Sequence, residues 1–242
     1  MQEVSARYQE LLTGSHTKES RLLVDGTAYG ESAIIKGSLK TAIALFAGDT
    51  PTVGGAVAGE ISVQLLGVAS SSVARMAELR PQVRLVGDSG EPSEWVAQGV
   101  YNVDKRSYNK QTGVLTLHGY DKMLATEQWY TGSVGTGSVG TGGVTDIAIV
   151  NRICSQVGIT LDSETATFFS TWGKSYKVAK PTDYTCRELL QAIAGWYGGN
   201  WCMTPVGKLR LVLLNSLPKE TNYLVDNGGS AITFGGDRIL VG

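Results

Sequence analysis

A glycine-rich segment, residues 131–143, divides the 242-residue chain into two parts with different sequence patterns. It reads TGSVGTGSVGTGG, a near-perfect duplication without a charged residue or a side chain larger than valine. Because glycine loses much conformational freedom when it is ordered, this composition favours a flexible linker or a projecting loop. A phosphate-binding loop would need a lysine and a serine or threonine after its last glycine, whereas Val144 follows here.

The part before this segment has the pattern of β-structure. Residues 100–108 and 114–120 form the clearest predicted hairpin, around a turn at 109–113. Strand alternation would place Leu115 and Leu117 on one face of this hairpin. Strands recur about every ten residues between glycine and polar clusters, which is typical of a small barrel or sandwich. We therefore expect a β-barrel or β-sandwich domain over residues 19–130.

The first 18 residues are predicted to form an N-terminal helix or arm. Val4, Tyr8, Leu11 and Leu12 lie at helical spacing, which indicates a short amphipathic helix. The charged residues in this stretch and the lack of a following apolar core argue against a secretory signal. No apolar run in the chain is long enough to predict a transmembrane helix.

The part after the glycine segment mixes helix and strand. Residues 146–157 carry an apolar helical face, and Gly158 stands where a glycine commonly ends a helix. Thr185 and Glu188 have the spacing of a capping box at the start of a second helix. A hairpin over 200–214 follows directly. We expect a small α+β domain over residues 144–215, so the predicted fold class is α+β, mainly β.

Composition argues against several functions. Lysine and arginine number 21 against 22 aspartates and glutamates, so no positive charge favours nucleic-acid binding. Only 18% of the residues are charged and 31 are glycine, which suggests a surface hidden in an assembly. The three cysteines, Cys154, Cys186 and Cys202, are expected to be buried thiols. His16 and His118 have no ligand partner at metal-binding spacing, so we predict neither a metal nor a cofactor.

Catalytic groups are hard to find in this sequence. A glycosidase would need two carboxyl groups across a cleft, and the sequence alone leaves that possibility open. The four carboxylates that could serve, for which solvated surface charge is the simpler interpretation, are Glu91, Glu94, Asp104 and Asp121. No catalytic residue is therefore predicted.

Aromatic residues are the best candidates for partner contacts. Trp129 and Tyr130 precede the glycine segment, and we expect both to be partly exposed. Trp172 is a further candidate contact, whereas core packing is the favoured interpretation of Trp196 and Trp201. The small basic patch of Lys105, Arg106 and Lys110 around Tyr108 is interpreted as a solvated hairpin end.

Several stretches resemble the hub proteins of phage tails, which include the central baseplate hub of contractile phages and the tail-tip or tail-associated proteins of long-tailed phages and prophages. The resemblance covers most of residues 20–215 and carries no catalytic signature. The matching stretches are Gly55–Leu66, Trp95–Val103, Val114–Met123, Pro181–Ile193, Ala194–Asn200 and Gly207–Leu211.

The resemblance implies an architecture of two tube-type β-barrel domains with a smaller α+β domain inserted. Three subunits would form a ring of pseudo-sixfold symmetry that adapts a hexameric tail tube to a trimeric tip. Residues 19–130 would be the first tube domain. Residues 216–242 would be the start of a second, truncated one.

The leading functional hypothesis is a structural virion protein, a baseplate hub or tail-tip subunit without catalysis. Its partners would be two further copies in a homotrimer ring, the tail tube or distal tail protein, and the tip or spike. The ring would let DNA pass without specific binding, and the protein would be made in the bacterial cytoplasm. The alternatives are a host-surface carbohydrate- or protein-binding module, using Trp129, Tyr130 and Trp172, and a cell-wall hydrolase.

Overall fold

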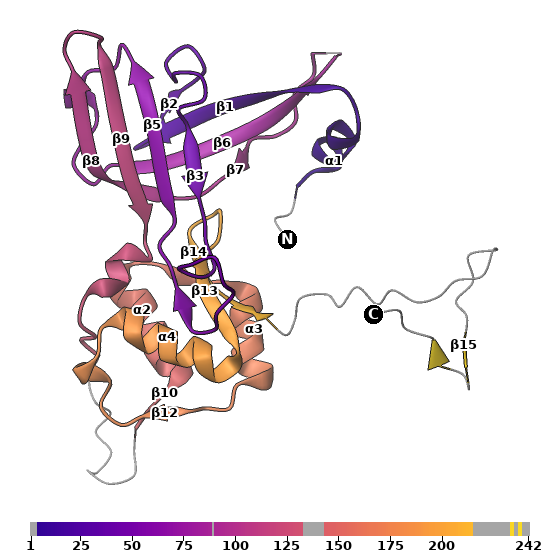
Figure 1. Ribbon diagram of the computed structural model, residues 1–242, viewed down its shortest axis with the longest axis vertical. Coiled ribbons are helices and arrows are strands. Elements are labelled where there is room, and N and C mark those ends of the chain that lie inside the picture. Colours follow the sequence, from indigo (N-terminus) through magenta and orange to yellow (C-terminus); the bar gives the residue numbers. More distant parts are fainter. Residues whose placement is uncertain (1–3, 89, 133–142, 215–232, 235–236, 239–242) are drawn as a thin grey trace.

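The computed structural model describes residues 4–88, 90–132, 143–214, 233–234 and 237–238. A long curved sheet lies above a smaller unit of helices and short strands (Figure 1). Strands outnumber helices in this part of the chain, and both large sheets contain antiparallel pairs. The predicted class, α+β and mainly β, is confirmed.

The larger sheet has eight strands in the order β2-β1-β6-β8-β9-β5-β3, with β7 paired to β6, and every pair is antiparallel. Buried and exposed side chains alternate along β5 and β9, which is the pattern of a sheet with one face on a core. The bounds are β1 (His16–Val24), β2 (Thr27–Tyr29), β3 (Lys40–Ala42), β5 (Glu60–Leu66), β6 (Glu78–Gly87), β7 (Val96–Ala97), β8 (Tyr101–Asn109) and β9 (Val114–Asp121).

This sheet curves without closing. After β2 the chain crosses to the far edge, where Ile34 bridges Leu65 of β5 and the Ile35 N–H donates to the Gln64 carbonyl. Among the described residues no strand pairing joins this crossing segment to β1. Of the two expected forms, a β-barrel or a β-sandwich, a closed barrel is not present in the described part of the chain, because β1 and the crossing segment do not pair with each other.

The core of the larger unit lies inside the curve of the sheet. Its apolar side chains come from β1, β5, β6, β8, β9 and the loops that cover them. Leu115 and Leu117 are fully buried, while Thr116 and His118 point to the other face, as the predicted hairpin requires. A short 3-10 helix, η1 (Ser70–Ser72), packs beside β8.

The predicted N-terminal helix is confirmed as α1 (Ala6–Thr13). Ser5 begins it, because its side chain accepts a hydrogen bond from the Tyr8 N–H. Leu11 is the buried residue of this helix, and its side chain packs over Gly87 at the end of β6. The strand β1 begins at His16, within the range predicted for the arm.

The smaller unit packs three helices against short strands. The strand order β11-β14-β13-β4 forms its main sheet, and β10 pairs with β12. The bounds are β4 (Gly55–Ala56), β10 (Val144–Thr145), α2 (Asp146–Val157), β11 (Thr160–Leu161), α3 (Ser163–Trp172), β12 (Lys177–Val178), η3 (Pro181–Asp183), α4 (Cys186–Tyr197), β13 (Gly199–Met203) and β14 (Lys208–Leu213).

Local sequence explains the ends of these helices. The capping box is present at α4, where the Thr185 hydroxyl accepts from the Glu188 N–H and the Glu188 carboxylate accepts from the Thr185 N–H. Gly158 and Gly198 end α2 and α4 with φ of 72° and 70°, the left-handed conformation that favours glycine. The sequence pattern did not predict α3, whose apolar residues follow the helical period less clearly and whose N-cap is Asp162.

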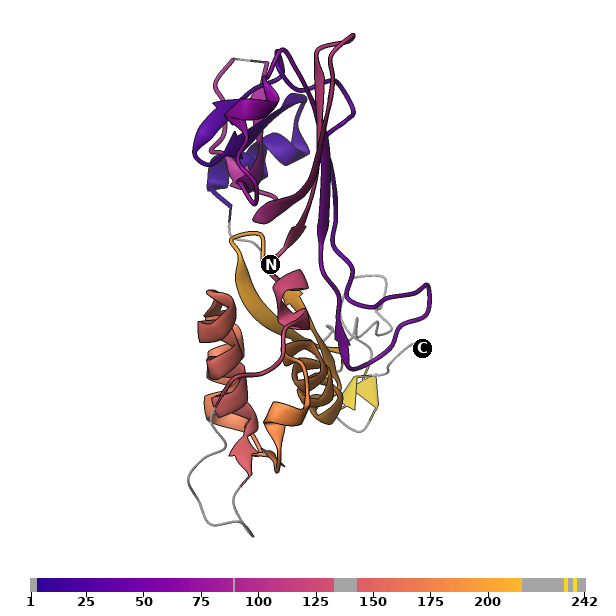
Figure 2. The same ribbon diagram turned by 90° about the vertical axis from the view of Figure 1, so that its left-hand side faces the viewer.

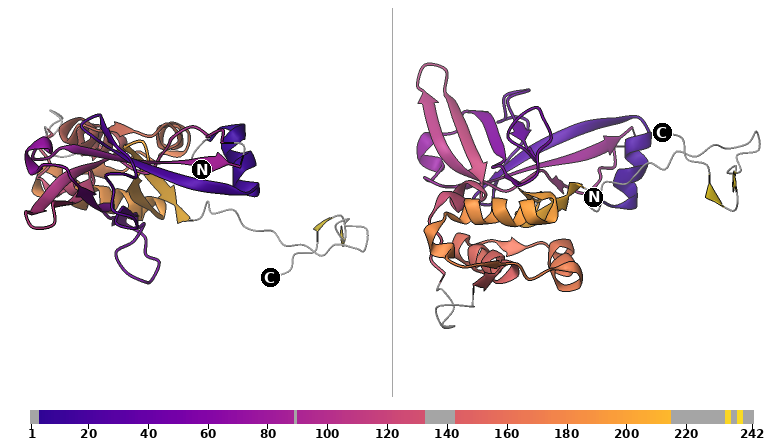
Figure 3. Two further views of the ribbon diagram at one scale, coloured as in Figure 1. Left: turned by 90° about the horizontal axis from the view of Figure 1, so that it is seen from above. Right: turned by 60° about the horizontal axis from the view of Figure 1, so that its bottom comes forward.

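The two units are interlocked along the chain. Between β3 and β5 the chain descends into the smaller unit, adds β4 in parallel beside β13, and returns (Figure 2). The residues before β4 project from the side of the molecule (Figure 3). Ala56, Met123 and Tyr130 belong to the core of the smaller unit although they precede the glycine segment.

Two predicted segments lie largely outside the described residues. These are the linker at 131–143, of which residues 133–142 are not described, and the C-terminal range 216–242. In the latter the described pair is β15 (Thr233–Phe234) with β16 (Asp237–Arg238). The predicted domain ranges stay predictions.

Candidate interaction surfaces

Trp129 and Tyr130, adjacent in sequence, have opposite environments. The Trp129 side chain is 64% exposed, beside the bridge that joins its backbone to Thr185. Tyr130 is 4% exposed and packs in the core of the smaller unit. The expectation that Tyr130 is exposed is wrong, because its backbone N–H is held by the Tyr184 carbonyl and its ring faces inward. The expected role of Trp129 in partner contacts stays a prediction.

Trp172 ends α3 and is 69% exposed. A cluster of aromatic rings lies in the same unit, where Tyr176 contacts Trp196 and Tyr197 with ring centroids 5.3 and 5.5 Å apart. Trp201 is fully buried, as expected, and its indole N–H donates to the Leu190 carbonyl. The core placement expected for Trp196 is wrong, because this side chain lies on the outer face of α4 and is 40% exposed.

Trp95 forms a contact that the sequence analysis missed. The guanidinium groups of Arg21 and Arg84 lie 4.2 and 4.5 Å from its ring centroid, which is the geometry of a cation–π pair. Glu19 neutralises Arg84 through an ion pair of 2.7 Å. Burial and the neighbouring charge of Arg84 lower the pKa of Arg21. The three side chains come from β1, β6 and the loop before β7. Because they are far apart along the chain, the sequence pattern did not predict that they form a cluster.

The basic patch at the β8–β9 hairpin is partly structural. Tyr108 and Arg106 are both exposed, and Arg106 donates to the backbone carbonyls of Ser70 and Val73 in the η1 region. Lys105 and Lys110 are exposed. Arg106 therefore fastens η1 to β8.

Two of the candidate carboxylates have structural roles. Glu94 accepts from the backbone N–H and the hydroxyl of Ser5, at 2.6 and 2.5 Å, and these bonds lower its pKa. They attach the start of α1 to the sheet. Glu91 and Asp104 are exposed. Among the described residues, no group of three or more His, Cys, Asp or Glu side chains could hold a metal ion.

Asp121 is a buried carboxylate at the junction of the two units. Its Oδ2 accepts from the Gly59 N–H at 2.8 Å, and its Oδ1 accepts from the Met123 N–H at 2.9 Å. Burial raises its pKa to about 6, against the opposing effect of these bonds and of Arg187. Arg187 also donates to the Met123 carbonyl at 2.8 Å, which ties α4 to the turn after β9. These bonds fit a structural role for Asp121.

The three cysteines are free thiols in the smaller unit. Cys154 and Cys186 are buried and Cys202 is half-buried. Burial raises the pKa of each thiol to about 11. A thiol of this kind is a poor nucleophile near neutral pH, because the thiolate is scarce.

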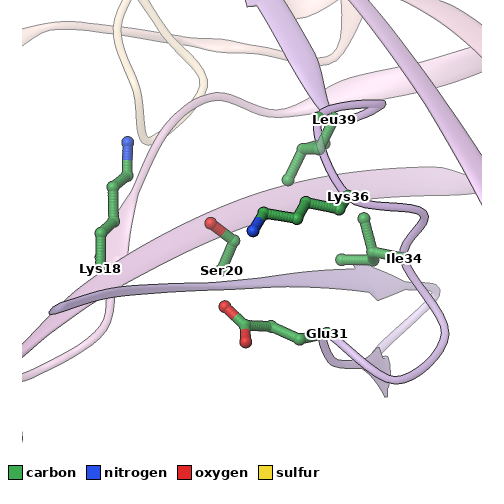
Figure 4. A pocket seen from close by; sticks show the side chains of 7 residues that line it. Lys18, Ser20, Glu31, Ile34, Lys36 and Leu39 are labelled. Carbon is green, nitrogen blue, oxygen red and sulfur yellow. The ribbon is translucent and has the colours of Figure 1, made fainter.

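A hollow of about 440 Å³ lies where the large sheet fails to close. Lys18 and Ser20 of β1 line one side, and Glu31, Ile34 and Lys36 of the crossing segment line the other. Lys36 and Glu31 extend toward Ser20, while Lys18 lies further along β1 (Figure 4).

No helix in the described part of the chain is long and apolar enough to span a membrane.

Comparison with solved structures finds chains that are similar to this one in fold. No family model matches the sequence, and no curated protein matches it. The chain is similar to the structure of the 43 kDa tail protein of prophage MuSo2 from Shewanella oneidensis, with a TM-score of 0.49 and 15% identity. The similarity covers 80% of this chain and 54% of the other, so this chain spans about half the length of that protein.

Proposed function

We propose that this protein is a structural component of a phage or prophage tail, a hub or tip subunit that joins the tail tube to the tip. The observation that carries the proposal is the junction between the two units. The stretches that resemble tail hubs lie in the large sheet and in the smaller unit that is interlocked with it. Gly55–Leu66 contains both β4 and β5, and Val114–Met123 contains β9 and leads into the smaller unit.

The bonding at this junction supports a load-transmitting role. The Asn200 side chain accepts from the Gly55 N–H at 2.5 Å and donates to the Thr52 carbonyl at 2.7 Å. Asp121 and Arg187 fasten a second connection between the units. A subunit that joins tube to tip must keep its two parts in a fixed relation, and buried hydrogen bonds of this kind provide rigidity.

Open sheet edges support assembly with other subunits. The outer edges of β2 and β3 have no strand partner among the described residues. Such edges pair readily with other chains, so a protein that works in an assembly uses them as contacts. A homotrimer ring with a central passage follows from the resemblance and is part of this proposal. A net charge of −1 is compatible with the passage of DNA without specific binding.

Two measurements test the tail role. Immunogold labelling of induced phage particles with antibody against this chain should mark the tail tip, and light scattering with electron microscopy should show trimers or rings at high protein concentration. Unlabelled particles together with a strict monomer would overturn the proposal. Clearing of purified cell wall by the protein, lost in an Asp104→Asn or Glu91→Gln variant, would instead establish the hydrolase.

The exposed indoles favour a surface-binding module as the second candidate. Trp129 and Trp172 both offer large apolar surface at low entropy cost, which suits a carbohydrate or protein contact. Binding to a glycan array or to host cell walls that is lost in Trp129→Ala and Trp172→Ala would support this function. Unchanged assembly in the same variants would then distinguish it from the structural role.

A further inference from the structure

The free part of β1 has the backbone geometry of a strand acceptor. β6 pairs with all of β1, whereas β2 pairs only with Leu22, Leu23 and Val24 on the opposite edge. Residues 16–21 therefore present an edge that has no strand partner among the described residues. Six residues are enough for a strand of ordinary length to pair.

Alternation shows which backbone groups face this edge. β1 and β2 are joined by the two residues Asp25 and Gly26, both with positive φ, so Val24 and Thr27 form the hydrogen-bonded pair that closes the hairpin. Every second residue of β1 then directs its N–H and C=O to the same edge, which includes Ser20 and Lys18. Pro81 agrees with this register, because it lacks an N–H and lies opposite Leu22 on the β6 side.

The side chains beside this edge combine an apolar floor with positive charge. Ile34 and Leu39 form the apolar lining of the hollow, which is large compared with the volume of a single water molecule. Lys18 and Lys36 line it too, and neither has an ion-pair partner within the part of the chain that the structure describes. Glu31 is the one carboxylate among the lining residues.

We propose that the hollow between β1 and residues 31–39 binds an extended, acidic segment of a partner polypeptide as an added strand. The added strand would run antiparallel to β1 and would occupy the edge of β1 beyond Tyr29, where β2 ends. The side chains of this strand that face the hollow would alternate in kind. An apolar side chain would lie opposite Ser20 and pack on Ile34, and an acidic side chain two residues later would lie beside Lys18. Main-chain bonds would supply affinity, and the two lysines would supply specificity.

The proposal commits to a different polypeptide as the partner, because the edge strands in the described part of this chain do not fit the hollow. The short edge strands β2 and β3 read TAY and KTA, and the distal part of β8, residues 104–109, reads DKRSYN. None of them has an apolar residue followed two positions later by an acidic one. The inference goes beyond the tail role, because it depends only on the edge and the hollow.

The test uses the full chain and three fluorescent eight-residue peptides. In the first, isoleucine and glutamate alternate on one face and threonine occupies the other. The second has lysine for glutamate, and the third has N-methylated isoleucine, which removes the backbone donors that would face β1. Fluorescence anisotropy should show saturable binding of the first peptide and at least about tenfold weaker binding of the other two.

Two variants of the protein locate the binding. Ser20→Pro removes an outward N–H and leaves the β6 ladder intact, so it should keep the melting temperature and abolish binding. Lys18→Glu with Lys36→Glu should reverse the preference to the lysine peptide. Lys105→Glu with Lys110→Glu, at the exposed hairpin, is the charge-matched control and should bind as the parent does.

Four outcomes would overturn the proposal. They are no binding of the glutamate peptide, equal binding of the glutamate and lysine peptides, unchanged binding by a folded Ser20→Pro variant, and self-association of the parent that this variant abolishes. The last outcome would assign the edge to a second copy of the chain. Any of these four outcomes would leave the tail proposal standing, because that proposal is tested separately by particle labelling.

Discussion

The side-chain amide of Asn200 bonds to the backbone of Gly55, 145 residues earlier in the chain, and so joins the two units of the molecule. Asn200 is fully buried. A side chain on Gly55 would come within 2.6 Å of the Leu45 carbonyl and 2.9 Å of Asn200 Oδ1. The parallel pairing of β4 with β13 therefore depends on a glycine at one position and an amide at the other.

Asn200→Ala should lower the free energy of unfolding by about 1 kcal/mol or more, because the half-buried Gly55 N–H and the Thr52 carbonyl lose their hydrogen-bond partner. Asn200→Asp should cost more, since it adds a buried charge facing the Thr52 carbonyl. Chemical denaturation measures both. Asn151→Ala, on the exposed face of α2, is the control and should change stability by less than about 0.5 kcal/mol. Equal effects at the two sites would contradict the assigned role of Asn200.

Asp121 should make stability depend on pH. Its pKa in the folded protein, about 6, exceeds the ordinary value of 3.8 because of burial. The folded state therefore binds the proton more tightly, and the free energy of unfolding should fall as pH rises from about 4 to about 6, by at most about 3 kcal/mol. Urea unfolding of the parent and of Asp121→Asn between pH 4 and 7 isolates this contribution, because carboxylates with a lowered pKa, such as Asp162, change the total stability in the opposite direction. The difference between parent and Asp121→Asn should change across that window, and a constant difference would contradict the prediction.

Arg210 should stabilise α3 through Asp162. The guanidinium donates to both carboxylate oxygens of Asp162, at 3.0 and 3.1 Å, and Asp162 begins the helix. Arg210→Ala would leave this buried carboxylate unpaired and should cost about 2 kcal/mol. Glu164→Ala removes only the exposed partner of Arg210, 3.4 Å away, and should cost less than about 1 kcal/mol. Thermal unfolding of both variants measures the difference, and similar losses would refute the assignment.

The neighbours Trp129 and Tyr130 should behave differently on truncation. Tyr130→Ala empties a core site and should lower stability by about 3 kcal/mol or more. Trp129→Ala removes an exposed side chain and should change stability by less than about 0.5 kcal/mol. If Trp129 contacts a partner, that variant should instead weaken assembly in sedimentation experiments. A large stability loss in Trp129→Ala would show that the indole is part of the fold.

The cysteines should react slowly in the folded protein. A pKa of about 11 in place of about 9 reduces the thiolate about a hundredfold at pH 8, and burial hinders the reagent further. Alkylation followed by mass spectrometry should show little label on all three before denaturant is added. Cys202 is half-buried, so it provides the strictest test. Its labelling at the rate of a free thiol would contradict the prediction.

Local signals in the sequence predicted local structure well. The capping box at Thr185, the helix end at Gly158 and the hairpin around 109–113 depend on residues a few positions apart, and the structure has each of them. The missed helix α3 lacks a strong apolar period. The exposure of Trp196 was not predicted, because the apolar periodicity of α4 does not show how much of this side chain the neighbouring elements cover.

Long-range contacts could not be predicted in the same way. The crossing segment between β2 and β3, the pairing of β4 with β13 and the stack of Arg21 and Arg84 on Trp95 join residues with no repeating pattern between them. The hollow beside β1 is a consequence of the same topology. Such features arise from the packing of whole elements, so a candidate interaction surface built from them is visible only in three dimensions.

The placement of β4 affects how the protein folds during synthesis. Gly55 leaves the ribosome well before Asn200, and at about 5–20 residues per second its partner strand arrives on the order of ten seconds later. During that interval the segment around β4 has no β13 to pair with. The larger sheet can begin to form in the nascent chain, but its connection to the smaller unit is completed only after β13 has been synthesised. A chain interrupted in the glycine segment would therefore expose this unpaired strand, which favours aggregation.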